Sequence, residues 1–321
     1  MGDLTAEFEA ERGRLTAVAY RMLGSRSEAE DAVQETWLRY AAALADPAAR
    51  AEIRQLGAWL TTTCSRICLD VLRSARVRRE TYPGQWLPEP VVTPLDALPR
   101  SDGFAPDPAE RVVRADQVGT ALLVVLERLS PEQRVAFVLH DVFAVPFARV
   151  GEVLGTTDVA ARQLASRARR AVNAPDAPRH TADTAEQQRV VRAFVAATES
   201  GELDQLVKVL APDVVLVGDG GGHFPAGPNR ILGADKVARF TLGLFGQAGR
   251  YGGRLRARPV LVDGVLGLQL ETVFRDGRPL RLVTALAVHE GRVTGIFNQL
   301  NPEKVRDVPP LGPEDTWPPR W

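Results

Sequence analysis

Residues 130–172 read SPEQRVAFVLHDVFAVPFARVGEVLGTTDVAARQLASRARRAV and decide the fold of the second helical block of the chain. Ser130 can cap a helix, and Gln133 completes a capping box with it. Pro146 opens a second helix, which ends at Gly155 because glycine tolerates the left-handed conformation of a turn. A third helix follows the turn. The stretch therefore predicts a helix-turn-helix.

The third helix of this stretch carries basic and amide side chains opposite a stripe of small apolar residues. Thr156 or Thr157 caps it, and Ala161 and Ala168 lie on its inward face. Arginine and glutamine can make bidentate contacts with base edges, and further arginines reach phosphates. This pattern favours a recognition helix in the DNA major groove over an ordinary surface helix. The residues expected to contact DNA are Thr157, Arg162, Gln163, Ser166, Arg167 and Arg170.

The bulk composition is that of a globular protein with a balanced charge. The 321 residues are 45% hydrophobic and 25% charged, and the formal net charge is 0. Attraction for phosphate must therefore come from local clusters of arginine. The acidic N-terminus lacks the features of a signal peptide, and no apolar run is long enough to cross a bilayer. We expect a cytoplasmic protein without a membrane segment and predict no obligate oligomer.

The cysteine and histidine content predicts no metal site and no cofactor. Cys64 and Cys68 are four residues apart in a helical pattern, and the four histidines are scattered. A structural zinc site would need two more ligands near this pair. The two thiols are therefore interpreted as small packing residues.

Proline and glycine divide the chain into blocks. Helical patterns fill the two blocks on either side of a Pro/Gly-rich linker. The last block begins with a helix pair over residues 184–210 and continues with strand-like runs, which predicts an α+β domain. The Pro-rich tail is expected to be loose. The expected boundaries are 1–82 and 109–174 for the helical domains, 83–108 and 175–183 for linkers, 184–306 for the α+β domain and 307–321 for the tail.

The first block contains an acidic helix followed by a basic one. The acidic pattern covers residues 27–39, and the basic run covers residues 59–79. In order and spacing these helices and the helix-turn-helix resemble bacterial sigma factors of the small extracytoplasmic-function group, over about residues 4–173. Residues 31–38 resemble the helix that binds core RNA polymerase. Residues 59–79 resemble the region that melts and reads the −10 element, and 130–172 the domain that reads the −35 element.

The resemblance implies two partners, core RNA polymerase and promoter DNA, and assigns residues to each. Unstacked bases of the −10 strand would be captured by aromatic and arginine surfaces, although Trp59 is equally well interpreted as a core residue. The residues implied to face the polymerase are Asp31, Gln34, Glu35 and Leu38. The residues implied to contact the −10 element are Trp59, Arg66, Arg73, Arg76, Arg78 and Arg79.

The last block resembles a SnoaL-like domain, a cone-shaped fold of the NTF2-like superfamily. The expected fold is thus two all-α sigma domains followed by an α+β cone. Three motifs, at residues 86–90, 219–222 and 301–305, resemble those of the sigma subfamily with a fused SnoaL-like domain. His223 follows the glycine run, where that subfamily usually has lysine. A stiff apolar linker segment should seek a partner surface, and a glycine run permits close backbone approach. The expected regulatory residues are Trp86, Leu87, Pro88, Glu89, Pro90, Asp219, Gly220, Gly221, Gly222, Asn301, Pro302 and Lys304.

Three interpretations of the last block stay open. In the interpretation that we favour, the last block positions the two sigma domains through the linker. In the second, it senses a small molecule, as such a domain would in a helix-turn-helix repressor. A third possibility is a SnoaL-type cyclase or isomerase, which would need acid–base groups that face one apolar pocket. The candidates for that role are Asp219, His223, Glu271 and His289. Because nothing in the sequence brings these four together, we predict that the protein is not an enzyme.

Overall fold

The computed structural model describes residues 2–45, 53–80, 82–95, 119–174, 177–224, 226, 229–250, 255–273 and 277–319. The chain forms two compact units. The first unit comprises residues 1–81, 103–117 and 125–175, and the second comprises residues 82–102, 118–124 and 176–321. Most of both helical blocks thus lies in one unit, whereas residues 82–102, which include most of the Pro/Gly-rich linker, and residues 118–124 belong to the other unit. The first ten residues of the helical domain predicted at 109–174 lie outside the described residues.

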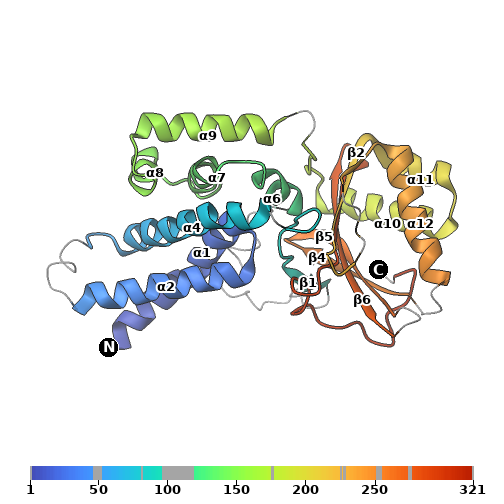
Figure 1. Ribbon diagram of the computed structural model, residues 1–321, viewed down its shortest axis with the longest axis horizontal. Helices are drawn as coiled ribbons and strands as arrows, with labels where there is room; N and C mark the ends of the chain where they lie inside the picture. The colour runs from blue at the N-terminus through green and yellow to red at the C-terminus, as the bar shows by residue number, and fades with distance from the viewer. Residues whose placement is uncertain are drawn as a thin grey trace. The chain divides into compact units, whose positions relative to one another are not determined.

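Three helices form the first part of the first unit: α1 (Gly2–Leu23), α2 (Arg26–Ala45) and α4 (Leu56–Glu80). They pack against one another, as Figure 1 shows for their labelled ribbons. Apolar residues at helical spacing, such as Phe8, Leu15 and Leu60, are fully buried between them. Cys64 and Cys68 are buried free thiols of α4, which confirms that they are packing residues.

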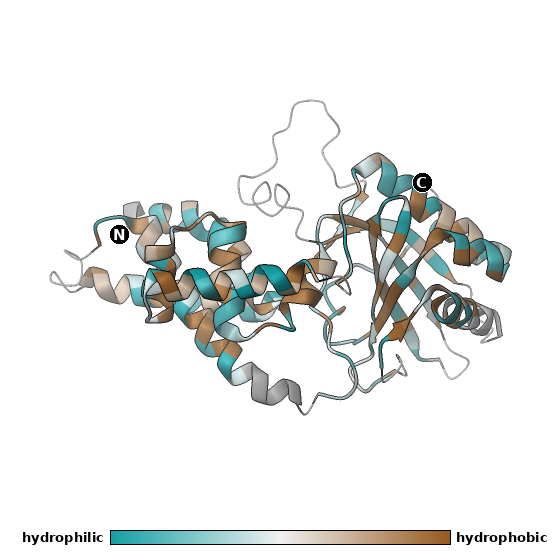
Figure 2. Cartoon of the chain, turned by 90° about the horizontal axis from the view of Figure 1, so that it is seen from above, coloured by the Kyte–Doolittle hydropathy of each residue, from teal (hydrophilic) through white to brown (hydrophobic). Residues whose placement is uncertain are grey.

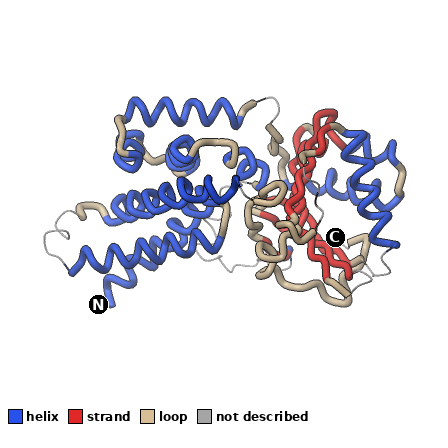
Figure 3. The backbone as a smooth tube through the Cα atoms, in the orientation of Figure 1, coloured by secondary structure: helices blue, strands red, loops and turns tan. Residues whose placement is uncertain are grey.

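The helix-turn-helix is confirmed in detail. Its elements are α7 (Pro131–Phe137), the short π-helix η2 (Val138–Val142), α8 (Phe147–Leu154) and α9 (Asp158–Val172). The preceding helix, α6 (Thr120–Leu126), lies mostly in the second unit. Ser130 and Gln133 form the predicted capping box. Gly155 ends α8 in the left-handed conformation, and Thr157 caps α9. Within the described part of this unit all regular structure is helical (Figure 3).

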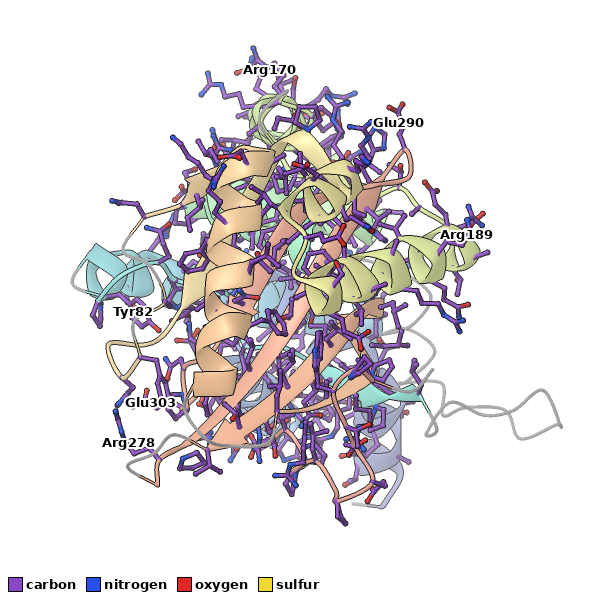
Figure 4. The ribbon with its side chains drawn as sticks, turned by 90° about the vertical axis from the view of Figure 1, so that its right-hand side faces the viewer. Tyr82, Arg170, Arg189, Arg278, Glu290 and Glu303 are labelled. Carbon is purple, nitrogen blue, oxygen red and sulfur yellow. The ribbon has the colours of Figure 1, made fainter. Side chains whose placement is uncertain are left out.

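The second unit is built on one mixed sheet, with the strand order β1-β4-β5-β6-β7-β2-β3 among the described residues. Its strands are β1 (Val92–Pro94), β2 (Leu210–Asp219), β3 (Ile231–Leu232), β4 (Arg256–Val262), β5 (Val265–Val273), β6 (Pro279–His289) and β7 (Arg292–Gln299). All neighbours are antiparallel except β2 and β7, which are parallel. The predicted Glu290-Gly291 turn joins β6 to β7, with both residues at positive φ. Glu290 lies at the tip of that hairpin in Figure 4.

Three helices cover one face of this sheet: α10 (Thr184–Ser200), α11 (Leu203–Val209) and α12 (Ala234–Arg250). Figure 4 shows the same helices in front of the strands, and Figure 2 shows hydrophobic stretches along the strands beneath. Val191, Phe194 and Leu206 join the core formed with β2, β6 and β7. The result is the expected α+β cone. The sequence-based interpretation missed α12 and both short strands, β1 and β3.

The C-terminal tail is packed against the sheet, and the expectation that it is loose is wrong for its described part, up to residue 319. Val308 and Leu311 are 5% and 4% exposed. Gln269 donates a hydrogen bond to the carbonyl of Pro309, and Arg256 donates one to the carbonyl of Leu311. Proline removes backbone donors from the tail but leaves its carbonyls, which these side chains use.

Candidate nucleic-acid interface and linker-binding cluster

The outer face of α9 presents the residues predicted to read DNA. Arg162, Gln163, Ser166, Arg167 and Arg170 are exposed, opposite the buried residues Ala161, Ala165 and Ala168. Arg170 projects away from the helix in Figure 4. Leu164 and Val172, on the same inner face, are only partly buried.

The turn between α8 and α9 packs closely against α8, which holds the two helices at a fixed angle. A Cβ on Gly151 would lie 2.8 Å from the carbonyl oxygen of Thr156, so only glycine fits there. Arg162 lies over the ring of Phe147 in α8, with its Cζ 4.8 Å from the ring centroid. Arg169 forms an ion pair with Asp141. The other basic residues predicted to contact DNA, Arg167 and Arg170, make no such contact with the described residues.

In α4, two of the arginines assigned to the −10 element contact the helix-turn-helix within the same unit. The Arg66 guanidinium donates a 2.7 Å hydrogen bond to the carbonyl of Glu152. The Arg73 guanidinium forms a 3.1 Å ion pair with Glu132. Burial raises the pKa of Glu132, whereas contact with the Arg73 guanidinium lowers it, and the pKa of Glu132 is lowered overall. The side chains of Arg76, Arg78 and Arg79 lie outside the described residues.

Trp59 has one face in an aromatic cluster and one at a polar hollow. Its ring centroid lies 6.0 Å from that of Tyr40, which also contacts Phe8 and Trp37. Trp59 also lines a hollow of about 390 Å³ together with Arg54, Arg66, Arg149 and Glu152, of which Arg149 and Glu152 form an ion pair. The tryptophan is therefore partly a core residue, as the alternative interpretation held, and partly accessible from a basic hollow.

Four residues assigned to polymerase binding share one face of α2. Asp31, Gln34 and Leu38 are exposed, and Glu35 is partly exposed with a 3.0 Å ion pair to Arg39. Leu38 is 54% exposed, which is unusual for a leucine on a polar helix face. The opposite face, with Ala32 and Val33, is buried. The spacing predicted from the sequence thus yields a continuous surface.

The second unit holds the linker through one buried carboxylate, Asp219, which is 0% exposed. Its Oδ1 accepts hydrogen bonds from the hydroxyl of Tyr82 (2.7 Å) and the amide of Gly221 (3.0 Å). Its Oδ2 accepts from the amide of Leu87 (2.9 Å) and pairs with Lys304 Nζ (2.7 Å). Donors from the linker, the glycine turn and Lys304 thus converge on one buried carboxylate.

Lys304 and Asn301 complete this arrangement. Lys304 Nζ also donates to the carbonyl of Leu87 (2.7 Å) and lies 4.1 Å from the ring centroid of Trp86. The Asn301 amide donates to the hydroxyl of Tyr82 (2.8 Å). Burial, together with the Asp219 carboxylate, raises the pKa of Tyr82, so its hydroxyl keeps its proton. We call these residues the linker-binding cluster: Tyr82, Trp86, Leu87, Asp219, Gln299, Asn301 and Lys304.

Close packing requires glycine in the run that follows Asp219. A Cβ on Gly221, which has a φ of +58°, would overlap the side chain of Asn301, and one on Gly220 would overlap the carbonyl oxygen of Phe224. A Cβ on Gly222 would lie 3.1 Å from Cγ of Pro83 in the linker. The glycines therefore let the turn close onto the linker and the Asn301 segment.

The other predicted motif residues have smaller roles. Leu87 is 1% exposed and lies in the core with β2 and β7, and the carbonyl of Pro88 accepts from Gln299 Nε2 (3.1 Å). Glu89 is buried, Pro90 is partly buried and Pro302 is exposed. Sequence reasoning missed two members of the cluster, Tyr82 and Gln299. Neither lies in a motif, and each meets its partners only through the folded sheet.

The candidate acid–base residues do not converge. Asp219 is engaged by the linker, His223 is exposed, and His289 Nδ1 bonds with the hydroxyl of Thr181 at 2.6 Å. Of these four, only Glu271 lines the cavity of the cone. Among the described residues no group of three or more His, Cys, Asp or Glu side chains could hold a metal ion. None of the described helices is long and apolar enough to span a membrane.

Comparison with known proteins identifies the family of the chain. Residues 8–78 match the family model of sigma-70 region 2, and residues 120–172 match that of sigma-70 region 4. The chain is 47% identical over 314 residues to the ECF RNA polymerase sigma factor SigJ of Mycobacterium tuberculosis, covering 95% of this chain and 94% of SigJ. It is 34% identical over 304 residues to the probable ECF sigma factor SigI of the same species, covering 93% of each.

The fold is shared as well. The crystal structure of M. tuberculosis SigJ superposes with a TM-score of 0.73 at 44% identity, covering 94% of this chain and 98% of that chain. The similarity thus extends beyond the two helical blocks into the α+β cone and the tail. The chain belongs to the extracytoplasmic-function RNA polymerase sigma factors, the alternative sigma factors that direct transcription initiation.

Proposed function

We propose that α9 reads the −35 element of a promoter and that α4 engages the −10 element. Arg167 and Arg170 are exposed, lie on one helix face and form no ion pair within the described part of the chain, which suits them to phosphate and base contacts. Trp59 offers an aromatic edge to an unstacked strand, and Arg54 and Arg66 add basic side chains beside it once Arg66 leaves the carbonyl of Glu152. The face of α2 with Asp31, Gln34, Glu35 and Leu38 would bind core polymerase, and the protein would act in the cytoplasm.

We further propose that the C-terminal domain regulates the sigma domains by fixing the linker between them. The observation that carries this proposal is the Asp219 carboxylate, which is fully buried and bonded to two linker residues, Tyr82 and Leu87. Losing the linker donors while this charge stays buried would leave the charge incompletely compensated, so the linker segment is released only when the whole cluster opens. The free length of chain between the two DNA-reading helices is thereby shortened.

The contacts of Arg66 and Arg73 suggest what the shortened linker maintains. Both arginines are assigned to DNA, and both are engaged by the helix-turn-helix in the free chain. Promoter binding requires these contacts to break. We propose that the linker-binding cluster favours the closed first unit and that its release favours the form that binds polymerase and DNA.

Two measurements separate this function from that of a helix-turn-helix repressor. In the first, the protein is mixed with core RNA polymerase and analysed by size-exclusion chromatography. In the second, run-off transcription is measured on a library of promoter fragments. A sigma factor co-elutes with core polymerase and yields defined transcripts that core polymerase alone does not produce. A repressor would do neither, and that result would refute the proposed assignment of the α2 and α4 surfaces.

A further inference from the structure

The α+β cone of the second unit contains an apolar cavity that the linker-binding cluster does not use. The cavity has a volume of about 180 Å³ and lies between α12 and the strands β5, β6 and β7. It reaches the surface at Leu244, which is 38% exposed. Its apolar lining includes Phe194, Phe245, Leu268, Leu282 and Ile296. An apolar cavity of this kind is the usual form of a small-molecule site.

Two threonine hydroxyls in the wall lack hydrogen-bond partners among the described residues. Thr241 of α12 is 5% exposed and Thr272 of β5 is 6% exposed, and the Oγ1 atom of each is buried without a partner. The two residues approach the cavity from the helix and from the sheet. Leaving a buried hydroxyl unpaired costs free energy, so such groups point to an absent partner.

A third polar group lies at the same wall. The Asn298 Oδ1 accepts a hydrogen bond from the hydroxyl of Thr284 (2.9 Å). Its Nδ2 makes no hydrogen bond with the described residues and is available as a donor. Two hydroxyls and one amide donor can bind either a hydroxyl or a carbonyl oxygen.

The charge of the lining restricts the ligand further. Among the described lining residues only Glu271 is ionisable, and both its oxygens are already occupied. Its Oε1 pairs with Arg281 at 2.7 Å, and its Oε2 pairs with Arg256 at 3.3 Å. A charged ligand would enter an apolar space without a free counter-charge, at a large desolvation cost.

We infer that this cavity binds a small uncharged molecule of one or two rings that carries a hydroxyl or carbonyl oxygen. An engineered cavity of about 150 Å³ holds benzene, so about 180 Å³ admits a single substituted ring or a small fused pair. The oxygen of the ligand bonds to Thr241 and Thr272, and its ring contacts the phenylalanine and leucine side chains.

The cavity shares two wall residues with the segments that hold the linker. Phe224 follows the glycine turn, and Leu300 precedes Asn301. The amide of Leu300 donates to the backbone carbonyl of Asp219 at 2.8 Å. A ligand in the cavity therefore touches both segments of the linker-binding cluster. That consequence rests on the regulatory role proposed above, whereas binding itself does not.

The test measures binding alone, by calorimetry and ligand-observed NMR on the full chain. The probes are 4-ethylphenol, which has a ring and one hydroxyl, ethylbenzene, which lacks the hydroxyl, and 4-ethylbenzoate, which is charged. We expect saturable binding of 4-ethylphenol with a Kd on the order of 0.1–1 mM, the range reasonable for a ligand of this size. We expect no binding of 4-ethylbenzoate.

Variants locate the site. In the double variant Thr241→Val, Thr272→Val the affinity for 4-ethylphenol relative to ethylbenzene should fall about three- to tenfold, the net value of one hydrogen bond. The matched control is Thr198→Val, because the buried Thr198 hydroxyl already bonds to the carbonyl of Phe194 and does not line the cavity. Thr241→Ser keeps the hydroxyl and should retain the preference.

Each outcome decides the inference. Saturable binding whose preference for the hydroxyl is lost in the double variant, but not in the control, supports it. Absence of binding by the folded protein means that water alone satisfies the threonines and overturns it. Binding with the same preference in the double variant places the ligand elsewhere and also overturns it. None of these results depends on whether the linker controls transcription.

Discussion

At the scale of single residues, Asp219 carries the strongest prediction. Asp219→Asn removes the charge that pairs with Lys304 and replaces one accepting oxygen with an amide donor. Removing one partner of a buried ion pair leaves the other uncompensated, so we expect a loss of about 3 kcal/mol in the free energy of unfolding of the second unit. Urea titration followed by circular dichroism measures it.

The matched control is Asp235→Asn in α12. Asp235 also pairs with a basic residue, Arg239, at 2.9 Å, but both side chains are well exposed. Exposed ion pairs contribute little to stability, so the unfolding midpoint should stay close to that of the natural sequence. Equal losses in both variants would contradict the role given to the Asp219 carboxylate.

His180 makes the second unit sensitive to acid. Burial lowers the pKa of His180, although Glu186 nearby opposes the shift, and its Nδ1 accepts a 3.1 Å hydrogen bond from the amide of Val288. A folded pKa below the unfolded value favours the neutral ring, so the stabilisation is present above about pH 6.5 and is lost as the pH falls below it.

Asparagine at position 180 can accept the same hydrogen bond without titrating. We therefore expect the free energy of unfolding to decline less steeply between about pH 7 and pH 5 in His180→Asn than in the natural sequence. Thermal melts at a series of pH values measure both slopes. His223→Asn, which removes an exposed histidine, is the control, and equal slopes in all three proteins would refute the assignment.

At the scale of elements, α9 is predicted to bind DNA through its outer face. Arg167→Ala and Arg170→Ala should each weaken binding of a random-sequence duplex and reduce the slope of log K against log salt by about 1, if each arginine meets one phosphate. Fluorescence anisotropy across a salt series gives both quantities. Arg189→Ala on α10 is the matched control, because Arg189 is equally exposed but lies in the second unit (Figure 4). Unchanged slopes in the α9 variants would contradict the recognition role.

The elements that were predicted from the sequence are those with local signals. The capping box at Ser130, the glycine at 155 and the alternating apolar strands identify the helix-turn-helix and five strands. Helix α12 was missed because Gly243 and Gly246 lower its apparent helix propensity, and its apolar face is defined by the sheet beneath it.

The candidate site could be predicted only in part, because its residues lie far apart along the chain. The motifs at Trp86, Asp219 and Asn301 were found from resemblance, but their mutual contacts join residues more than a hundred positions apart. Strand β1 was hidden in a proline-rich linker, where its three residues pair with β4 only in the folded domain. Local pattern carries no information on such pairing.

At the scale of the whole molecule, we propose a sigma factor that is restrained through its own linker. The two sigma domains occupy one compact unit in which Arg66 and Arg73 contact the helix-turn-helix. The linker between those domains belongs to the other unit and is held at Asp219. If only the open form binds polymerase, the apparent affinity equals the intrinsic affinity multiplied by the fraction of molecules in the open form.

This restraint is tested most directly by run-off transcription at limiting core polymerase with full-length protein and its Asp219→Asn variant, both shown to be folded. We predict that Asp219→Asn raises the transcript yield and the apparent affinity for core polymerase several-fold, whereas Asp235→Asn leaves both unchanged. Equal yields from the natural sequence and Asp219→Asn, or a lower yield from Asp219→Asn with intact core binding, would contradict it.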